Sequence, residues 1–159
     1  MEPYEEFLIQ SQRQYEVAIH LLTETYPFVK DPKMLPAILE RLYYAIDHTI
    51  TALLRFERNH KRIPAYNDDF DEKWALVKKI ATKYKLKLKG LDEIRTLWVK
   101  EKEASLVFAR KESLVLVHSK IHTLNAAKLK DLSSKTKVFI EAIRNGLRTE
   151  VIQEAGIQR

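Results

Sequence analysis

The sequence contains no cysteine, which excludes disulfide bonds, thiolate metal sites and a cysteine nucleophile. It has only three glycines, and they are scattered, so no glycine-rich phosphate loop is present. No apolar run approaches the roughly 18 residues of a membrane span, because charged residues interrupt every long apolar segment. The opening stretch MEPYEEFLIQ is acidic where a secretory signal is basic. We therefore expect a cytoplasmic protein with no membrane partner.

Nucleophile motifs and paired catalytic carboxylates at a recognisable spacing are also missing, so motifs alone predict neither an enzyme nor a cofactor. What is present is the composition of a folded globular chain, with 45% apolar and 31% charged residues. A length of 159 residues fits a single domain, 1–159. Lys and Arg outnumber Asp and Glu by 28 to 22, and this net charge of +6 slightly favours anionic partners.

Apolar side chains recur with helical spacing over most of the chain. The stretch 3–26 predicts an amphipathic helix. Asp31 and Pro32 are suited to be the N-cap and first residue of a second helix that runs to about Lys61. This second helix is apolar around most of its circumference, so it is either the central helix of a bundle or half of a subunit interface.

The acidic loop PAYNDDFDE is suited to cap a third helix, from about Phe70 to Lys83, and a short helix resumes at Leu91. Residues 105–119 alternate with period two and predict a β-hairpin with its turn at KES. A last helix follows, for which Asn145-Gly146 is a C-terminal stop signal, leaving a tail at 148–159. The expected fold is all-α, an up-and-down four- to five-helix bundle with a small hairpin before the last helix.

The second helix resembles one family. In the HEPN superfamily the second helix often carries Tyr-Tyr-Ala, then His, then Ala-Leu-Leu, and the final helix here also resembles that of family members. The matching positions here are Tyr43, Tyr44, Ala45, His48, Ala52, Leu53 and Leu54, and then Lys137, Phe139, Ile140 and Ile143. The resemblance implies a helical bundle that dimerises. It also implies a prokaryotic setting of toxin–antitoxin pairs, in which members are metal-independent ribonucleases or non-catalytic partners of minimal nucleotidyltransferases.

Active HEPN ribonucleases carry an Arg, four to six residues, then a His, and this sequence departs from that motif. Where it is expected, seven residues separate Arg110 from His118, within the predicted hairpin. Elsewhere two pairs have an allowed spacing, but about one such match is expected by chance. These pairs, Arg41 with His48 and Arg55 with His60, are therefore candidates for a catalytic role only, with a solvated helix surface as the simpler explanation.

Asp47 and His48 lie in the middle of the apolar second helix. Tyr44 precedes His48 by four residues and Tyr43 precedes Asp47 by four, so the four side chains are spaced to hydrogen-bond on one helix surface. Such a network fixes the register of packed helices or subunits. We favour this structural interpretation over ligand contact, and ligand contact over catalysis.

A basic cluster follows the third predicted helix. An aromatic residue, Tyr84, lies within it, so the cluster could track a phosphate backbone and stack on a base; the alternative is a solvated surface. Its members are Lys78, Lys79, Lys83, Lys85, Lys87 and Lys89. His118 and His122 have the spacing of a helical metal pair, but no Glu lies nearby and a strand is expected there, so no metal site is predicted.

The sequence as a whole favours a non-catalytic binding or interaction module. We expect a homodimer through the second or first helix, which partners a nucleotidyltransferase or binds nucleotide or RNA. A ribonuclease toxin of the same fold is one alternative. A purely structural protein-interaction dimer is the other.

Overall fold

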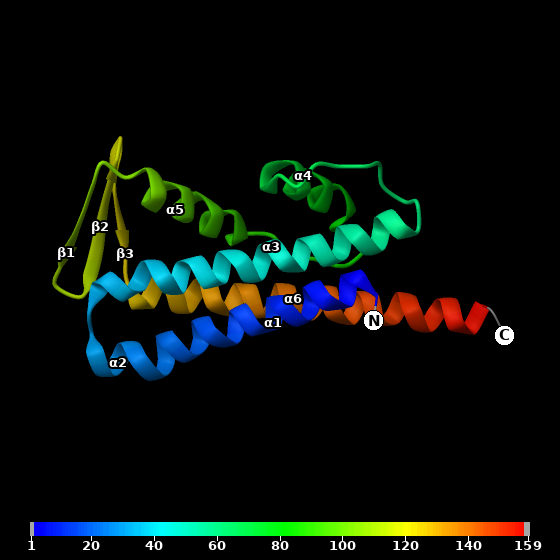
Figure 1. The fold of residues 1–159 in the computed structure, drawn as a ribbon, viewed down its shortest axis with the longest axis horizontal. Coiled ribbons are helices and arrows are strands. Elements are labelled where there is room, and N and C mark those ends of the chain that lie inside the picture. Colours follow the sequence, from blue (N-terminus) through cyan, green and yellow to red (C-terminus); the bar gives the residue numbers. More distant parts are fainter. Residues whose placement is uncertain (1, 158–159) are drawn as a thin grey trace.

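The structure, a computed structural model, describes residues 2–157 and is mostly helical with a small antiparallel sheet, as the sequence predicts (Figure 1). The long helices are α1 (Pro3–His20), α3 (Leu35–Asn59) and α6 (Ala126–Ile157). The shorter elements are a π-helical turn (Leu21–Thr25), α2 (Tyr26–Val29), a 3-10 turn (Pro32–Met34), α4 (Phe70–Ile80), α5 (Leu91–Glu103), β1 (Leu106–Arg110), β2 (Ser113–His118) and β3 (Lys120–Leu124). No helix within the described range is long and apolar enough to span a membrane.

Helix α3 is central. It packs against α1 and α6 along its length and against α4 and α5 on another side, as Figure 1 shows. Its apolar residues, such as Leu42, Ile46 and Leu53, are 1% exposed or less. Within one chain, α3 is therefore a central helix and not half of a subunit interface. A single chain already buries the apolar surface of α3, so that surface does not require a dimer.

The chain stays helical between α1 and α3 for longer than expected. The π turn leads directly into α2, which contains Pro27 in its first turn. This helix ends at Val29 and is capped by Lys30, whose φ of 54° is left-handed. Asp31 then accepts a hydrogen bond from the Lys33 amide at 3.0 Å and caps the 3-10 turn. Pro36 lies in the first turn of α3, where its missing N–H leaves no helical bond unmade.

The third predicted helix, α4, begins at Phe70 as expected. Asp69 caps it by accepting from the Glu72 amide at 3.1 Å. It ends at Ile80 instead of Lys83, because residues 81–90 form a loop that folds back toward α3 and α6. Helix α5 then places Trp98 against Tyr43, with the ring centroids 4.3 Å apart.

The predicted hairpin is confirmed as β1 and β2, which pair in register from Leu106 opposite Val117 to Arg110 opposite Ser113. The sequence did not reveal the third strand, β3, which pairs with the other edge of β2. Leu114, Leu116 and Leu124 are buried, so one face of the sheet closes the core at the end where α3 begins.

Helix α6 continues through Asn145 and Gly146 to Ile157, so the predicted stop there is wrong. Gly146 serves packing instead of capping. A Cβ atom at this position would lie 2.6 Å from a ring carbon of Tyr84, and only glycine admits that ring. The predicted tail is helical up to Ile157, and its last two residues lie outside the described range.

Candidate functional site

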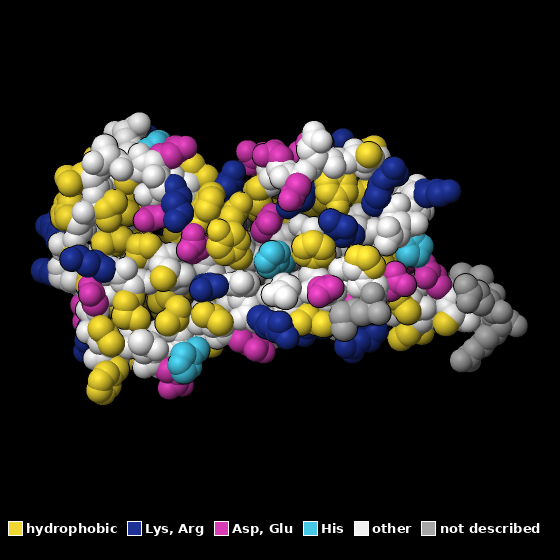
Figure 2. All heavy atoms as spheres, in the orientation of Figure 1, with side chains coloured by type: hydrophobic (Ala, Val, Ile, Leu, Met, Phe, Trp, Pro, Cys, Tyr) yellow, Lys and Arg dark blue, Asp and Glu magenta, His cyan; other side chains and the backbone are white. Residues whose placement is uncertain are grey.

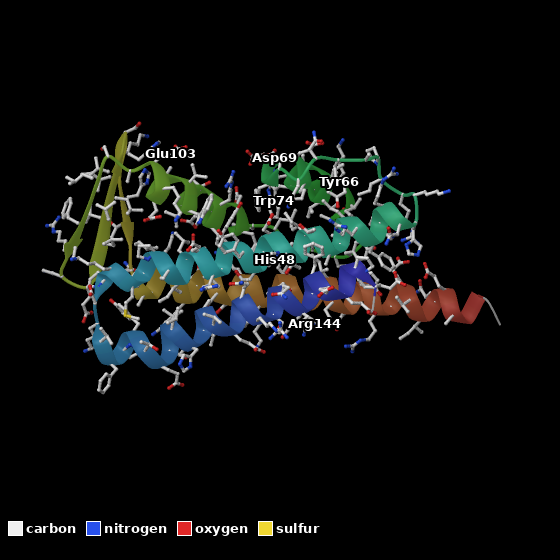
Figure 3. The ribbon with its side chains drawn as sticks, in the orientation of Figure 1. His48, Tyr66, Asp69, Trp74, Glu103 and Arg144 are labelled. Carbon is white, nitrogen blue, oxygen red and sulfur yellow. The ribbon has the colours of Figure 1, made fainter. Side chains whose placement is uncertain are left out.

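A pocket of about 410 Å³ lies between the beginning of α1, the second half of α3 and the loop that leads to α4. Two of its residues, His48 on α3 and Tyr66 in the loop, are labelled in Figure 3. Helical spacing along α3 brings most of the lining to one surface, and α1 supplies Phe7. The lining consists of Pro3, Phe7, Asp47, His48, Thr51, Arg55, Arg58, Asn59, Ala65, Tyr66 and Asp68.

A buried lysine lies behind the pocket. Lys73 of α4 is 2% exposed, and its ammonium group lies 2.8 Å from Asp47 Oδ1, 2.7 Å from Asp68 Oδ1 and 3.1 Å from Thr51 Oγ1. The Thr51 hydroxyl donates to the Asp47 carbonyl at 2.8 Å, which leaves its lone pairs for the lysine. All three ammonium donors of Lys73 therefore have acceptors, and the residue joins the loop to α3.

Electrostatics keep this group charged. Burial opposes the charged form of Lys73, but the hydrogen bonds that it donates to Asp47 and Asp68 outweigh burial and raise its pKa above the ordinary value. The bond from Lys73, together with its charge, lowers the pKa of Asp68. The two carboxylates thus share one positive charge, which offsets half of their own charge and reduces their repulsion of an anion in the pocket.

His48 is half-buried at the pocket wall. Its ring lies 6.0 Å from Phe7 and 6.4 Å from Tyr44, measured between centroids. Burial lowers the pKa of His48 and Lys73 lowers it further, although Asp47 and Asp68 act in the opposite direction. The imidazole is therefore neutral at pH 7, a form that can accept a proton.

Arg55 supplies a cation to the same pocket. Its guanidinium carbon lies 5.0 Å from the centre of the Phe7 ring, a cation–π distance that fixes the side chain. Arg55 forms no ion pair with any residue in the described part of the chain. Arg58 donates to the Ile63 carbonyl at 3.3 Å and helps to hold the loop. With Lys73, the arginines give the site one more cation than it has carboxylates.

The structure separates both Arg/His pairs proposed from spacing. Arg41 is exposed and donates to Gln14 at 2.9 Å, outside the pocket. His60 lies at the end of α3, where Nδ1 is 2.8 Å from the Phe56 carbonyl and Nε2 contacts Glu154. One member of each pair, His48 and Arg55, instead lines the common pocket.

The proposed polar network is also distributed differently. Tyr44 and His48 do lie together, but Asp47 pairs with Lys73. The Tyr43 hydroxyl accepts from Arg95 at 3.2 Å, and burial raises the pKa of Tyr43 to about 12. Asp47 thus pairs with α4 and Tyr43 with α5, and not with each other as their spacing predicts.

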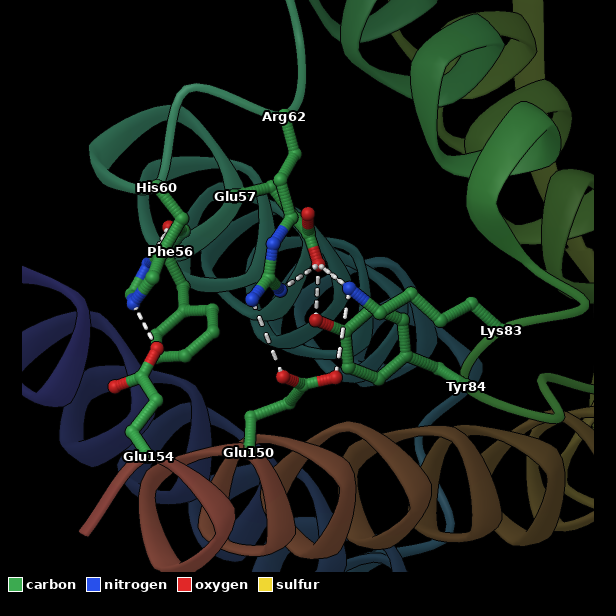
Figure 4. A network of polar contacts seen from close by, with 8 residues as sticks. All are labelled: Phe56, Glu57, His60, Arg62, Lys83, Tyr84, Glu150 and Glu154. Atoms are coloured by element: carbon green, nitrogen blue, oxygen red, sulfur yellow. Dashed lines mark hydrogen bonds and ion pairs between the residues drawn. The ribbon is translucent and has the colours of Figure 1, made fainter. Parts of the chain in front are cut away.

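A second charged cluster, the Glu57 network, lies further along α3 (Figure 4). Glu57 is 1% exposed and accepts hydrogen bonds from Lys83 at 3.1 Å, Arg62 at 3.4 Å and the Tyr84 hydroxyl. Glu150 of α6 binds Arg62 at 3.3 Å and Lys83 at 3.4 Å. Burial and the bond to Glu57 raise the pKa of Tyr84. These contacts join α3, the 81–90 loop and α6. They pair the charged groups with one another, including Lys83 and Glu150, which line a hollow of about 520 Å³.

The six lysines of the basic cluster are all exposed, but they are not equivalent. Lys83 is held by Glu57 and Glu150. Tyr84 is buried, so it offers no surface on which a base can stack, and that part of the prediction is wrong. Lys87 and Lys89 line a hollow of about 440 Å³ with Ser134, Lys135 and Val138.

The two histidines considered for a metal pair lie on separate strands, where His118 contacts Glu103 at 3.2 Å and His122 pairs with Leu116. No family model, curated protein or solved structure matches the chain. The interpretation of the site therefore rests on its own geometry.

Proposed function

We propose that this protein is a non-catalytic binding module, and that its pocket holds the phosphate of a nucleotide or of an RNA. The carrying observation is the placement of Arg55 over Phe7 in a 410 Å³ pocket together with Arg58 and Tyr66. This volume lies within the range of small-ligand sites, ~300–1,000 Å³.

The side chains suit a phosphate for separate reasons. A guanidinium presents its donors as a planar fork that matches two phosphate oxygens, and stacking on Phe7 reduces the entropy that Arg55 loses on binding. Burial raises the pKa of Tyr66, so its hydroxyl stays a donor at neutral pH. Lys73 offsets one of the two carboxylate charges beside it, and the two arginines then leave the pocket with a net positive charge that favours an incoming anion.

Calorimetry with adenosine nucleotides and a short single-stranded RNA tests this function. Replacing Arg55 by Ala should weaken binding about 10-fold or more, since a hydrogen bond to a charged group is worth ~1.5–3 kcal/mol. Arg41→Ala is the matched control, because Arg41 is an exposed arginine of the same helix outside the pocket. Equal losses in the two variants, or no binding by the wild type at millimolar nucleotide, would contradict the proposal.

The exposed lysines near the end of α4 support a nucleic-acid ligand. Lys78 and Lys79 lie on the helix, and Lys85, Lys87 and Lys89 follow in the loop. If they contact the backbone of a bound RNA, the affinity for RNA should fall steeply with salt, and more steeply than the affinity for a mononucleotide.

A ribonuclease is the second candidate, favoured by the presence of His48 and Arg55 in one pocket. A neutral imidazole can take the proton of a 2′-hydroxyl while an arginine holds the phosphate. We expect no cleavage above a control preparation in the presence of a chelator. Metal-independent cleavage that is lost in His48→Ala and kept in His60→Ala would favour the ribonuclease.

The HEPN resemblance adds an up-and-down bundle, a homodimer and a minimal nucleotidyltransferase partner to this proposal. The central position of α3, which carries the resembling residues, supports the bundle and does not bear on the homodimer or the partner. A nucleotidyltransferase encoded next to this chain, and its co-purification with it, would test the partnership.

A further inference from the structure

Strand β1 is an open edge. The strand order is β1-β2-β3, so β1 pairs on one side only within the described residues. All five of its residues are exposed, with Leu106 55%, Val107 42% and Phe108 43% accessible. Figure 1 places the strand at one end of the molecule, where Figure 2 shows hydrophobic side chains on the surface.

Nothing in the sequence of this edge protects it. Natural proteins guard exposed edges with prolines, charges in mid-strand or bulges that interrupt the register. β1 contains no proline, its only charge is the terminal Arg110, and all five residues pair with β2 in unbroken register. Ser105 also binds the Val117 carbonyl, from its amide at 2.9 Å and its hydroxyl at 3.1 Å, which fixes where the strand begins. The edge is thus regular, apolar and able to accept another strand.

We propose that β1 pairs antiparallel with β1 of a second copy of this chain, with Phe108 opposite Phe108 on a twofold axis. Antiparallel pairing lets a twofold axis relate two identical edges and close the assembly as a dimer. The two sheets then form one continuous sheet, and the exposed side chains on both faces of β1 gain cross-strand neighbours.

The side chains suit this register. It places Val107 opposite Ala109 and Leu106 opposite Arg110, so the two arginines lie at opposite ends and no like charges face each other. It also places the turn residue Lys111 of each copy opposite Ser105 of the other, two residues after Glu103, whose side chain is 62% exposed and contacts His118 of its own chain. This charge complementarity, which an unrelated extended peptide would not supply, is the reason to assign the edge to a second copy.

The absence of cysteine from the natural sequence gives a direct test. In Phe108→Cys the two introduced thiols would face each other on the axis, where opposed Cα atoms are within the ~4.4–6.8 Å of a disulfide. Mild oxidation should convert most of the chain to a covalent dimer. Ile121→Cys, on β3 and 73% exposed, is the control and should stay largely monomeric. Equal cross-linking of both variants, or none in Phe108→Cys, would overturn the pairing.

A non-covalent measurement supports or overturns the same register. A pairing of five residues is a small interface, so the wild-type mass in light scattering should rise toward a dimer only as concentration increases through the micromolar range. Phe108→Glu places two carboxylates on the axis and should abolish that rise, while Ile121→Glu should not. A wild type that stays monomeric, or a dimer that survives in Phe108→Glu, would show that this edge is not the interface.

Discussion

Two charged clusters lie along the same helix, and they bury charge for different purposes. Toward the middle of α3, Asp47 meets Lys73, which is 2% exposed; further along, Glu57, which is 1% exposed, meets Lys83, Arg62 and Tyr84. In both clusters a single buried ion is surrounded by partners of opposite sign or by hydrogen-bonding groups. Burial of charge therefore does not by itself distinguish a binding site from a structural one.

The two clusters differ in whether ionisable groups are left without an ion-pair partner. In the Glu57 network, Arg62 and Lys83 each bridge Glu57 and Glu150, so the charges satisfy one another (Figure 4). Lys73 likewise contacts both of its carboxylates, but the same cavity is also lined by a neutral His48 and by Arg55, which forms no ion pair among the described residues. A functional site is better marked by ionisable groups that line a cavity without an ion-pair partner than by ionisable groups that are buried.

Removing Glu57 should produce the largest effect. Glu57→Ala leaves the buried Tyr84 hydroxyl without its acceptor and two cations without their shared carboxylate. We expect a loss of about 3 kcal/mol in urea-induced unfolding, because breaking a buried pair typically costs ~3–5 kcal/mol and these two cations are partly solvated. Nucleotide affinity of the folded fraction should not change.

Glu93→Ala is the matched control for this loss, because Glu93 pairs with Lys128 at the surface. Surface pairs contribute ~0–1 kcal/mol. If the two variants unfold at similar urea concentrations, the Glu57 network is not the structural element described.

The fit of Tyr84 against α6 gives the next largest effect. Gly146→Ala would place a methyl group 2.6 Å from the Tyr84 ring, and relieving that overlap should cost ~1–3 kcal/mol of thermal or chemical stability. Gly156→Ala, in the same helix with nothing within 4 Å, should be neutral or stabilising. Equal effects of the two substitutions would mean that helix propensity, and not the contact with Tyr84, determines the stability.

Much of the fold could be predicted because its signals are local. Apolar stripes located the helices, and period-two alternation located the β1–β2 hairpin. The end of α6 was mispredicted, because the sequence around Gly146 is the same whether this glycine ends a helix or makes room for a distant aromatic ring. Only the contact with Tyr84, from another part of the chain, distinguishes the two.

Only part of the site could be predicted from the sequence. His48 and Arg55 could be selected by type and spacing, but their common pocket depends on Tyr66, Asp68 and Lys73, which arrive through tertiary contacts. One signal was available: Lys73 lies on the buried surface of α4, between Phe70 and Val77. A lysine on an apolar helix surface requires a buried partner, and the acidic loop before α4 supplies Asp68 as well as the capping Asp69.

The smallest expected effect is on the pH dependence of stability, which distinguishes His48 in the pocket from Asp68, the partner of the buried Lys73. The pKa of His48 is below its ordinary value, so the unfolded chain takes up the proton first as the pH falls below about 6.5. His48 therefore contributes stability that is complete above that pH and is lost as the pH falls toward the folded-state pKa. His48→Gln should reduce the loss of stability between neutral pH and about pH 5.5, measured by thermal unfolding in matched buffers.

Asp68 also has a lowered pKa, but its contribution to stability is lost only as the pH falls below about 4. Asp68→Asn should therefore alter stability at the acid end and leave the slope above pH 5.5 unchanged or steeper, because removing its charge disfavours the protonated form of His48. If the wild type and His48→Gln lose stability equally over that interval, the pocket imidazole is not the group that titrates there.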